Sequence, residues 1–177
     1  MWRRYAKGRN MTNQSVIFVV GEGNSGKSTL IRGLTGCGRN KVYNVKNTAG
    51  NSLRAFVSLN APQEMGMRTH SPQNFPESIE TKYHVNRNDY DVLISALRLS
   101  VSNQAAYGYE SYIQSVRRKG FAVKLAVIDT SWNSNHADPA ELFTMNTFAQ
   151  TNGITLIHLN ASNDPNQESS RMRILYP

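Results

Sequence analysis

The sequence predicts an α/β domain, with three layers (α/β/α) arranged around a mostly parallel sheet of about five strands. Two observations predict this fold class. Apolar, strand-like segments alternate along the 177-residue chain with segments of helical periodicity. The strand-like segments are also almost continuously apolar, which is typical of strands covered by helices on both faces. The length suits one domain, so we expect a single unit at 15–177, preceded by a basic extension at 1–14.

Five segments are rich in the apolar, β-branched and aromatic residues that strands favour. The first, 16–20, is a run of five apolar residues that leads directly into glycines. The other four lie at 53–59, 91–97, 121–128 and 154–159. If all five strands are parallel, their carboxyl ends share one edge of the sheet, where ligands of open parallel sheets bind.

Helical spacing of apolar residues, or helix-capping signals, mark the segments at 27–35, 76–85, 105–116, 138–153 and from 164 onward. Asp138 and Asp164 are each followed by proline, which predicts an aspartate N-cap with proline in the first turn. Residues 60–76 contain three prolines and no clear period. A segment of this length without regular structure is often functional, although it can also be a simple surface excursion.

The charge and the cysteine content indicate which partners and which cellular compartment fit the protein. The formal net charge is +8, and residues 1–54 carry ten Lys or Arg but only one acid, Glu22. This basic third indicates attraction to nucleic acid or to another acidic partner, or else a solvated basic face. A single cysteine, Cys37, fits a reducing compartment, and no apolar run approaches the length of a membrane span. We therefore expect a cytoplasmic protein without membrane contact.

The first strand runs into the sequence GEGNSGKS at 21–28, followed by a helical stretch. Glycines in such a turn let successive backbone N–H groups point inward at phosphate oxygens, and the following helix adds its positive end. A lysine at the mouth of the helix, Lys27, can reach the β- and γ-phosphates, and the hydroxyl of Ser28 can ligate Mg²⁺. The motif with its flanking strand and helix predicts a nucleoside triphosphate site.

This stretch resembles the Walker A motif of the P-loop NTPase superfamily. The resemblance implies that nucleotide and its Mg²⁺ are held by the loop and the first helical turn, at Gly21, Gly23, Asn24, Ser25, Gly26, Lys27, Ser28 and Thr29. Thr29 is expected near the α-phosphate. The sequence LAVID, ending at Asp129, is similar to a Walker B motif, whose carboxylate usually holds Mg²⁺ through water. The alternative is that Asp129 caps the following loop.

Residues of the 60–76 segment supply further candidates. Glu64 can polarise the attacking water if the segment folds over the γ-phosphate, although an exposed loop glutamate is the simpler interpretation. Arg68, with His70, can neutralise transferred phosphate, as arginines do in small nucleotide kinases. We expect the segment to order over the γ-phosphate and to exclude bulk water.

The base is expected to be adenine. Guanine-specific P-loop proteins carry an N/T-K-x-D tetrapeptide, and the NKVY at 40–43 lacks its aspartate, nor does the chain contain a D-x-x-G switch. Asn160 follows the last strand, where deviant-Walker partition-type ATPases use an asparagine for adenine. The resemblance to those ATPases is partial, because they have a lysine early in the loop where this chain has Glu22.

The sequence therefore predicts Mg²⁺-dependent ATP binding and hydrolysis, with Lys27 stabilising the transferred phosphoryl group. Two other functions fit the same motif. One is a phosphotransferase that acts on a small acceptor. The other is a nucleotide-switched module that binds DNA or protein with little turnover.

Overall fold

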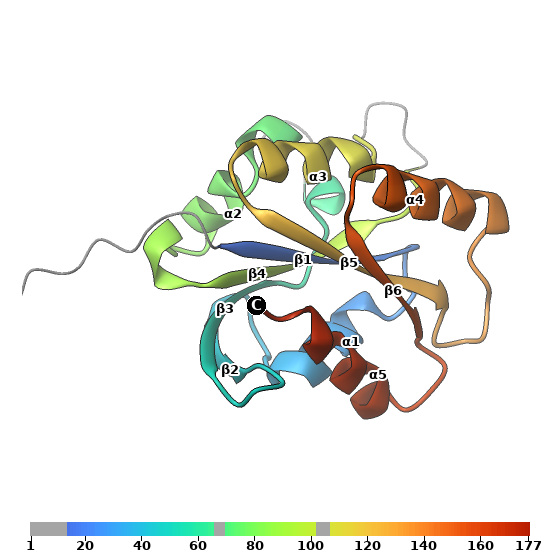
Figure 1. Cartoon of the computed structure of the whole chain (residues 1–177), viewed down its shortest axis with the longest axis horizontal. Helices are drawn as coiled ribbons and strands as arrows, with labels where there is room; N and C mark the ends of the chain where they lie inside the picture. The colour runs from blue at the N-terminus through green and yellow to red at the C-terminus, as the bar shows by residue number, and fades with distance from the viewer. Residues whose placement is uncertain (1–13, 66–69, 102–106) are drawn as a thin grey trace, which may run out of the picture.

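The computed structural model describes residues 14–65, 70–101 and 107–177 (Figure 1). These residues form a six-stranded sheet in the order β2-β3-β4-β1-β5-β6. Its strands are β1 (Ser15–Gly21), β2 (Val42–Lys46), β3 (Ser52–Ser58), β4 (Val92–Arg98), β5 (Ala122–Thr130) and β6 (Thr155–Asn160). All neighbouring strands pair in parallel except β2, which is antiparallel to β3. The predicted α/β fold class is confirmed, with the five predicted strands all present and parallel.

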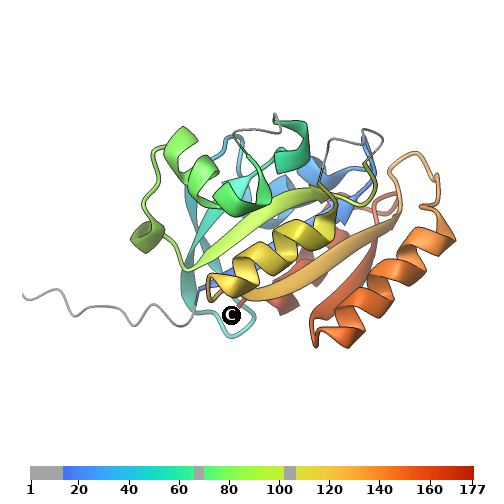
Figure 2. The same ribbon diagram turned by 90° about the horizontal axis from the view of Figure 1, so that it is seen from above.

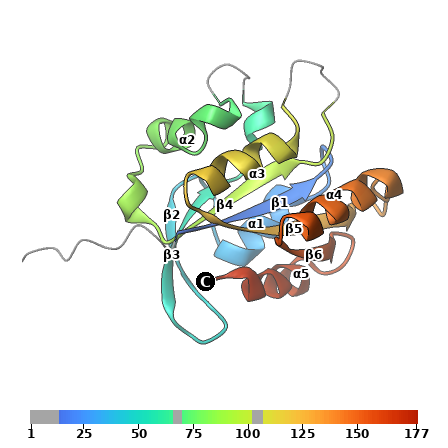
Figure 3. The ribbon, with the colours of Figure 1, turned by 45° about the horizontal axis from the view of Figure 1, so that its top comes forward.

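Helices cover both faces of the sheet, as Figures 1, 2 and 3 show from three directions. In the part of the chain that the structure describes, the α-helices are α1 (Lys27–Thr35), α2 (Glu77–Lys82), α3 (Tyr109–Arg118), α4 (Pro139–Thr151) and α5 (Pro165–Met172). Helices α2, α3 and α4 lie on one face, and α1 and α5 on the other. The described residues also contain four short 3₁₀ helices, at Pro62–Glu64, Pro72–Asn74, Arg87–Asp89 and Arg173–Leu175.

The hydrophobic core is split by the sheet into two layers. Alternate residues of β1 point to opposite faces, so Phe18 packs toward α2–α4 while Ile17 and Val19 pack toward α1 and α5. Every residue of β1 is buried. This double burial explains why the strand is continuously apolar in sequence, because neither face can hold polar side chains.

Strand β2 was not predicted from the sequence. It lies at the edge of the sheet, where it pairs on one side only, with β3. Asn44 and Lys46 are exposed and Val45 is buried, so the segment shows neither a continuous apolar run nor a strong alternation. Charged and polar residues are typical of edge strands, where they discourage pairing with other chains.

The second half of the 60–76 segment is packed against α3. Tyr112 Oη donates to the carbonyl of His70 at 2.7 Å, and Ser115 Oγ donates to that of Pro72 at 2.5 Å. Burial raises the pKa of Tyr112 to about 12 and lowers the pKa of the buried His70. The described second half of the segment is therefore fixed against α3 by hydrogen bonds, and ordering of the segment over a bound phosphate stays a prediction. Arg68 lies outside the described residues.

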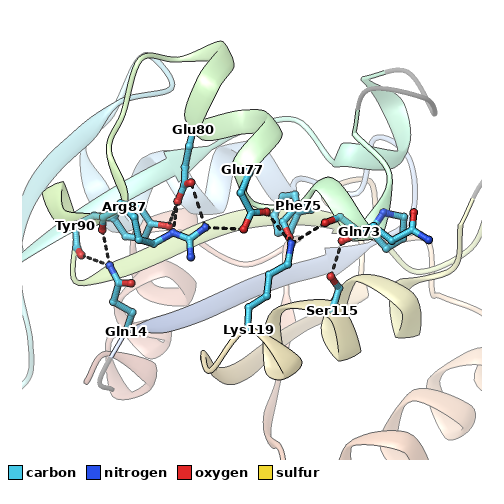
Figure 4. Close-up of polar contacts among 10 residues, drawn as sticks. Gln14, Gln73, Phe75, Glu77, Glu80, Arg87, Tyr90, Ser115 and Lys119 are labelled. Atoms are coloured by element: carbon cyan, nitrogen blue, oxygen red, sulfur yellow. Dashed lines mark hydrogen bonds and ion pairs between the residues drawn. The ribbon is translucent and has the colours of Figure 1, made fainter. Parts of the chain in front are cut away.

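A polar network fastens α2 to the start of β4 and the end of α3 (Figure 4). The carboxylate of Glu80 is 8% exposed and accepts from Tyr90 Oη at 2.5 Å and from both Nε and Nη2 of Arg87. Lys119 Nζ reaches the carbonyls of Gln73 and Phe75 at 2.8 and 2.7 Å. In Figure 4 the side chains of Arg87 and Lys119 both extend toward the carboxylates that α2 carries, and these contacts hold α2 in place.

Helices α1 and α5 approach each other closely on the opposite face. Ser169 Oγ donates to the carbonyl of Leu30 at 2.9 Å. A Cβ atom at Gly33 would clash with Ser169 Oγ, so a glycine is needed for this approach. The helix that follows the glycine-rich loop is thus held by the last helix of the chain.

Candidate phosphate-binding site

The loop 22–26 connects the carboxyl end of β1 to the amino end of α1. Gly26 has a φ of 104°, a conformation that other residues rarely adopt, and a Cβ there would lie 3.2 Å from Cβ of Ala161. Among the described residues, no side chain caps the amino end of α1 by a hydrogen bond, and the first turn of α1 contains no acidic residue. Its free N–H groups and its positive end are therefore available to an anion.

Two further features show that the loop is shaped for a ligand. A Cβ at Gly21 would clash with Ser25 Oγ, and one at Gly23 would come within 3.0 Å of the Arg98 guanidinium. The hydroxyl of Ser25 is buried and has no hydrogen-bond partner among the described residues. Buried polar groups are nearly always paired, so an unpaired hydroxyl here indicates a missing partner such as a phosphate oxygen.

Lys27 lies folded over the loop. Its Nζ donates to the carbonyls of Gly21 at 3.2 Å and of Glu22 at 2.6 Å. Burial lowers the pKa of Lys27, and the negative charge of Glu64 opposes this effect. The ammonium group is therefore held by loop carbonyls that an anionic ligand can replace.

The loop opens into a polar hollow of about 420 Å³, which we call the phosphate hollow. It is lined by Asn24, Ser25, Gly26, Lys27, Ser28, Thr29, Asn60, Glu64 and Trp132. The hydroxyl of Ser28, one of these lining residues, donates to the carbonyl of Leu59 at 3.0 Å. The structure thus brings Glu64 together with Lys27 and Ser28, as the sequence suggested.

Arg98 directly follows the predicted strand at 91–97, so the sequence places it at the edge of the sheet that carries the glycine-rich loop, but it was given no role there. It ends β4, in register with Gly21 on the neighbouring β1, so its guanidinium reaches the glycine-rich loop. Its Nε lies 3.7 Å from Oε1 of Glu64. The Gln63 amide exchanges two hydrogen bonds with the Arg98 backbone, at 3.1 and 3.3 Å, and so fixes the turn that carries Glu64. A strand-end arginine is visible in the sequence, but the neighbour of β1 is not.

Two predicted residues lie elsewhere. Asp129 does not line the phosphate hollow, and its Oδ2 lies 3.7 Å from Nδ1 of His158 on the adjacent strand. Asn160 accepts from the backbone nitrogen and the hydroxyl of Ser162, at 3.0 and 2.5 Å. The side-chain oxygen of Asn160 is therefore occupied by its own turn, although the adjacent Ala161 lies beside Gly26.

The basic third of the chain is only partly described, because residues 1–13 lie outside the described part. Within it, Arg54 forms an ion pair with Asp91, and Lys41 lies over the ring of Tyr43. None of the helices in the described ranges is long and apolar enough to cross a membrane. Those ranges also contain no cluster of three His, Cys, Asp or Glu side chains suited to a metal.

Comparison with known proteins finds similarity of fold only. No protein-family model and no curated protein sequence matches the chain. Among solved structures, a probable GTP-binding protein EngB aligns with 91% of this chain and 97% of its own, at 17% identity and a TM-score of 0.51. The FeoB G-domain from Methanococcus jannaschii aligns with 93% of this chain and 99% of its own, at 13% identity and a TM-score of 0.49. With its glycine-rich loop between β1 and α1, the chain has a P-loop NTPase fold.

Proposed function

We propose that the protein binds a nucleoside triphosphate with Mg²⁺ at the glycine-rich loop and hydrolyses it, with ATP preferred. One observation carries this proposal: Lys27, Ser28 and the uncapped start of α1 converge on one polar hollow that also holds the carboxylate of Glu64. Cationic and N–H donors bind phosphates, and a carboxylate beside them serves a metal or a water molecule.

The chain's own groups have distinct roles in this proposal. Lys27 exchanges the carbonyls of Gly21 and Glu22 for phosphate oxygens, and the negative ligand favours its charged form. The N–H groups of the loop and the first turn of α1 orient the phosphate chain. Arg98, one strand away, adds a second cation beside the loop where negative charge gathers during phosphoryl transfer.

The side chains present fit a magnesium ion. Mg²⁺ prefers oxygen ligands and is usually held by one or two protein oxygens together with phosphates and water. When bound, it neutralises charge on the β- and γ-phosphates. Ser28 and Glu64 supply a hydroxyl and a carboxylate in the same hollow, whereas the carboxylate of Asp129 lies beside His158. We therefore assign the acidic role at the metal to Glu64 in place of Asp129.

Paired variants test this assignment. Glu64→Gln is expected to remove most of the gain in ATP affinity that Mg²⁺ provides, because it removes the charge and retains the shape. Asp129→Asn, the matched control, is expected to leave that gain within about twofold, with only the contact to His158 affected. Calorimetric titration of ATP with and without Mg²⁺ gives both values. A lost Mg²⁺ response in Asp129→Asn alone would return the metal role to Asp129.

The preference for adenine is the less direct part of the proposal. The solved structures of similar fold include a probable GTP-binding protein, but at 17% identity this similarity concerns the fold and not the base. The N/T-K-x-D tetrapeptide of guanine-specific proteins is absent from this sequence. The loop after β6 reads Asn160-Ala161-Ser162-Asn163 and passes beside Gly26 through Ala161. An adenine contact through the side-chain oxygen of Asn160 requires that its turn with Ser162 open, whereas a contact in which its Nδ2 donates does not.

ATP is therefore expected to compete more strongly than GTP for the site, because the sequence lacks the aspartate that pairs with guanine. Competition against a fluorescent nucleotide measures the ratio. The same samples are then assayed for phosphate release with Mg²⁺ and no added acceptor, which separates hydrolysis from phosphotransfer. Tighter binding of GTP would reverse the assigned base. Formation of ADP only when a small acceptor is added, without release of free phosphate, would make the protein a phosphotransferase.

A further inference from the structure

Trp132 is the only apolar side chain that lines the phosphate hollow among the described residues, and 63% of its surface is exposed. The remaining lining residues are glycine, hydroxyl, amide and charged residues. Trp132 also borders a second cavity, of about 280 Å³, which lies between the glycine-rich loop and the loop after β5. Burial of a large aromatic side chain is energetically favourable. An indole exposed to water at the rim of a polar site therefore indicates a surface that a ligand can cover.

The loop that carries Trp132 is held in a defined shape. The backbone nitrogen of Ser131 donates to the carbonyl of Asn135 at 2.8 Å, and that of Ser134 donates to Ser131 at 2.9 Å. Thr130 Oγ1 and His136 Nδ1 lie 3.2 Å apart and join the two ends of the loop. The backbone that carries Trp132 is therefore fixed beside the phosphate hollow by hydrogen bonds within its own loop.

The same loop meets the phosphate-binding loop at Gly26. A Cβ at Gly26 would lie 3.9 Å from Cβ of Trp132 and 3.2 Å from Cβ of Ala161. The loops after β5 and β6 thus border the glycine-rich loop at the residue before α1. A nucleotide whose phosphates contact Lys27 and the first turn of α1 must place its nucleoside at the rim of the hollow, where Trp132 lies.

We propose that Trp132 is the platform on which the base of the bound nucleotide stacks. This inference rests on the proposed nucleotide binding and deepens it by assigning the nucleobase subsite. Every base presents a flat π-face, so stacking on an indole adds affinity with little choice of base. Trp132 therefore contributes to the binding of ATP and GTP alike, and the preference between them is set by hydrogen bonds elsewhere.

The test compares ligands with and without a base. ATP, GTP and inorganic tripolyphosphate are titrated into the full chain carrying Trp2→Phe, which leaves Trp132 as the single tryptophan. Tripolyphosphate occupies the phosphate positions but offers nothing to stack. ATP and GTP are expected to quench the fluorescence of Trp132, because a stacked base changes its surroundings, and tripolyphosphate is expected to leave it nearly unchanged.

Affinities supply the second readout, measured by calorimetry in the chain without the Trp2 change. Trp132→Ala is expected to weaken ATP and GTP by a similar factor, about 5- to 150-fold, and tripolyphosphate by less than about twofold. Trp132→Phe is expected to retain part of the affinity because it keeps a smaller ring. Phe143→Ala is the matched control, since Phe143 is 73% exposed on α4 and lines neither cavity.

Each outcome is decisive. Equal losses for ATP and tripolyphosphate would overturn the platform and make Trp132 a support of the phosphate loop. An unchanged ATP affinity in Trp132→Ala, or ATP binding no tighter than tripolyphosphate in the unaltered chain, would overturn the platform and leave the phosphate site standing. Failure of the unaltered chain to bind either ligand would overturn the proposed function, and the platform with it.

Discussion

Lys27→Ala is expected to weaken the binding of ATP by at least about 30-fold. The Nζ atom of Lys27 is held over the glycine-rich loop by two carbonyls, and it is the one cation that lines the phosphate hollow among the described residues. Truncation of one partner of a buried charge pair costs roughly 2–5 kcal/mol, which is about 30-fold or more in Kd. Calorimetric titration with ATP measures the loss directly.

Three comparisons make the result specific. Lys46→Ala removes an exposed lysine from β2, at the far edge of the sheet, and is expected to bind ATP normally. Lys27→Met keeps most of the buried stem and should lose as much affinity as Lys27→Ala, because the charge is the active part. Urea unfolding of Lys27→Ala should show stability close to that of the unaltered chain. ATP binding that survives in Lys27→Ala would refute the assignment of the phosphate hollow.

Glu80→Ala is expected to destabilise the fold by about 3–5 kcal/mol. The substitution removes a buried carboxylate that accepts from the hydroxyl of Tyr90, and it leaves the guanidinium of Arg87 with its contact to Glu77 alone (Figure 4). The cost combines the unpaired hydroxyl of the buried Tyr90 with the loss of the main ion-pair partner of Arg87, of whose side chain 22% is exposed. For a chain of this size the midpoint of thermal unfolding should fall by roughly 6–20 °C.

Glu77 offers a matched control on the same helix. Its carboxylate also contacts Arg87, at 3.0 Å, and Lys119, at 2.7 Å, but half of its side chain is exposed. Ion pairs in water contribute about 0–1 kcal/mol, so Glu77→Ala should cost far less than Glu80→Ala. Equal losses in thermal scans of the two variants would show that burial does not set the strength of this network.

Much of the fold was readable from the sequence because its signals are local. Segments rich in apolar and other strand-forming residues marked the five parallel strands, of which only 16–20 is a continuous apolar run. The Asp-Pro pairs marked the starts of α4 and α5, where Asp138 and Asp164 each cap the helix by accepting a backbone N–H. Strand β2 escaped notice because an edge strand has one partner and mixed polarity. Its pairing with β3 is a property of the assembled sheet, which no short window of sequence contains.

The site divides in the same way. The glycine-rich loop is one continuous segment, so its motif predicted that it connects β1 to α1 and that Lys27 and Ser28 lie at the start of α1. Arg98, at the end of β4, and Trp132, in the loop after β5, also lie beside the glycine-rich loop. Their distance from this loop depends on the order of the strands in the sheet. Asp129 shows the reverse case. Asp129 lies near the carboxyl end of a strand, as the sequence predicted, but its carboxylate lies beside His158 on the adjacent strand. No sequence pattern predicts this contact.

The close approach of Ser169 to Gly33 has a mechanical consequence. Helix α5 packs on α1, the helix that follows the glycine-rich loop. A force that separates α5 from α1 would therefore remove a packing contact of α1 without acting directly on the residues of the loop. The last residue is anchored in turn, since its carbonyl accepts from Nδ2 of Asn47 at 3.0 Å, in the turn between β2 and β3. A force applied at Pro177 would therefore act first on the contact with Asn47 and then, through α5, on the helix that follows the glycine-rich loop.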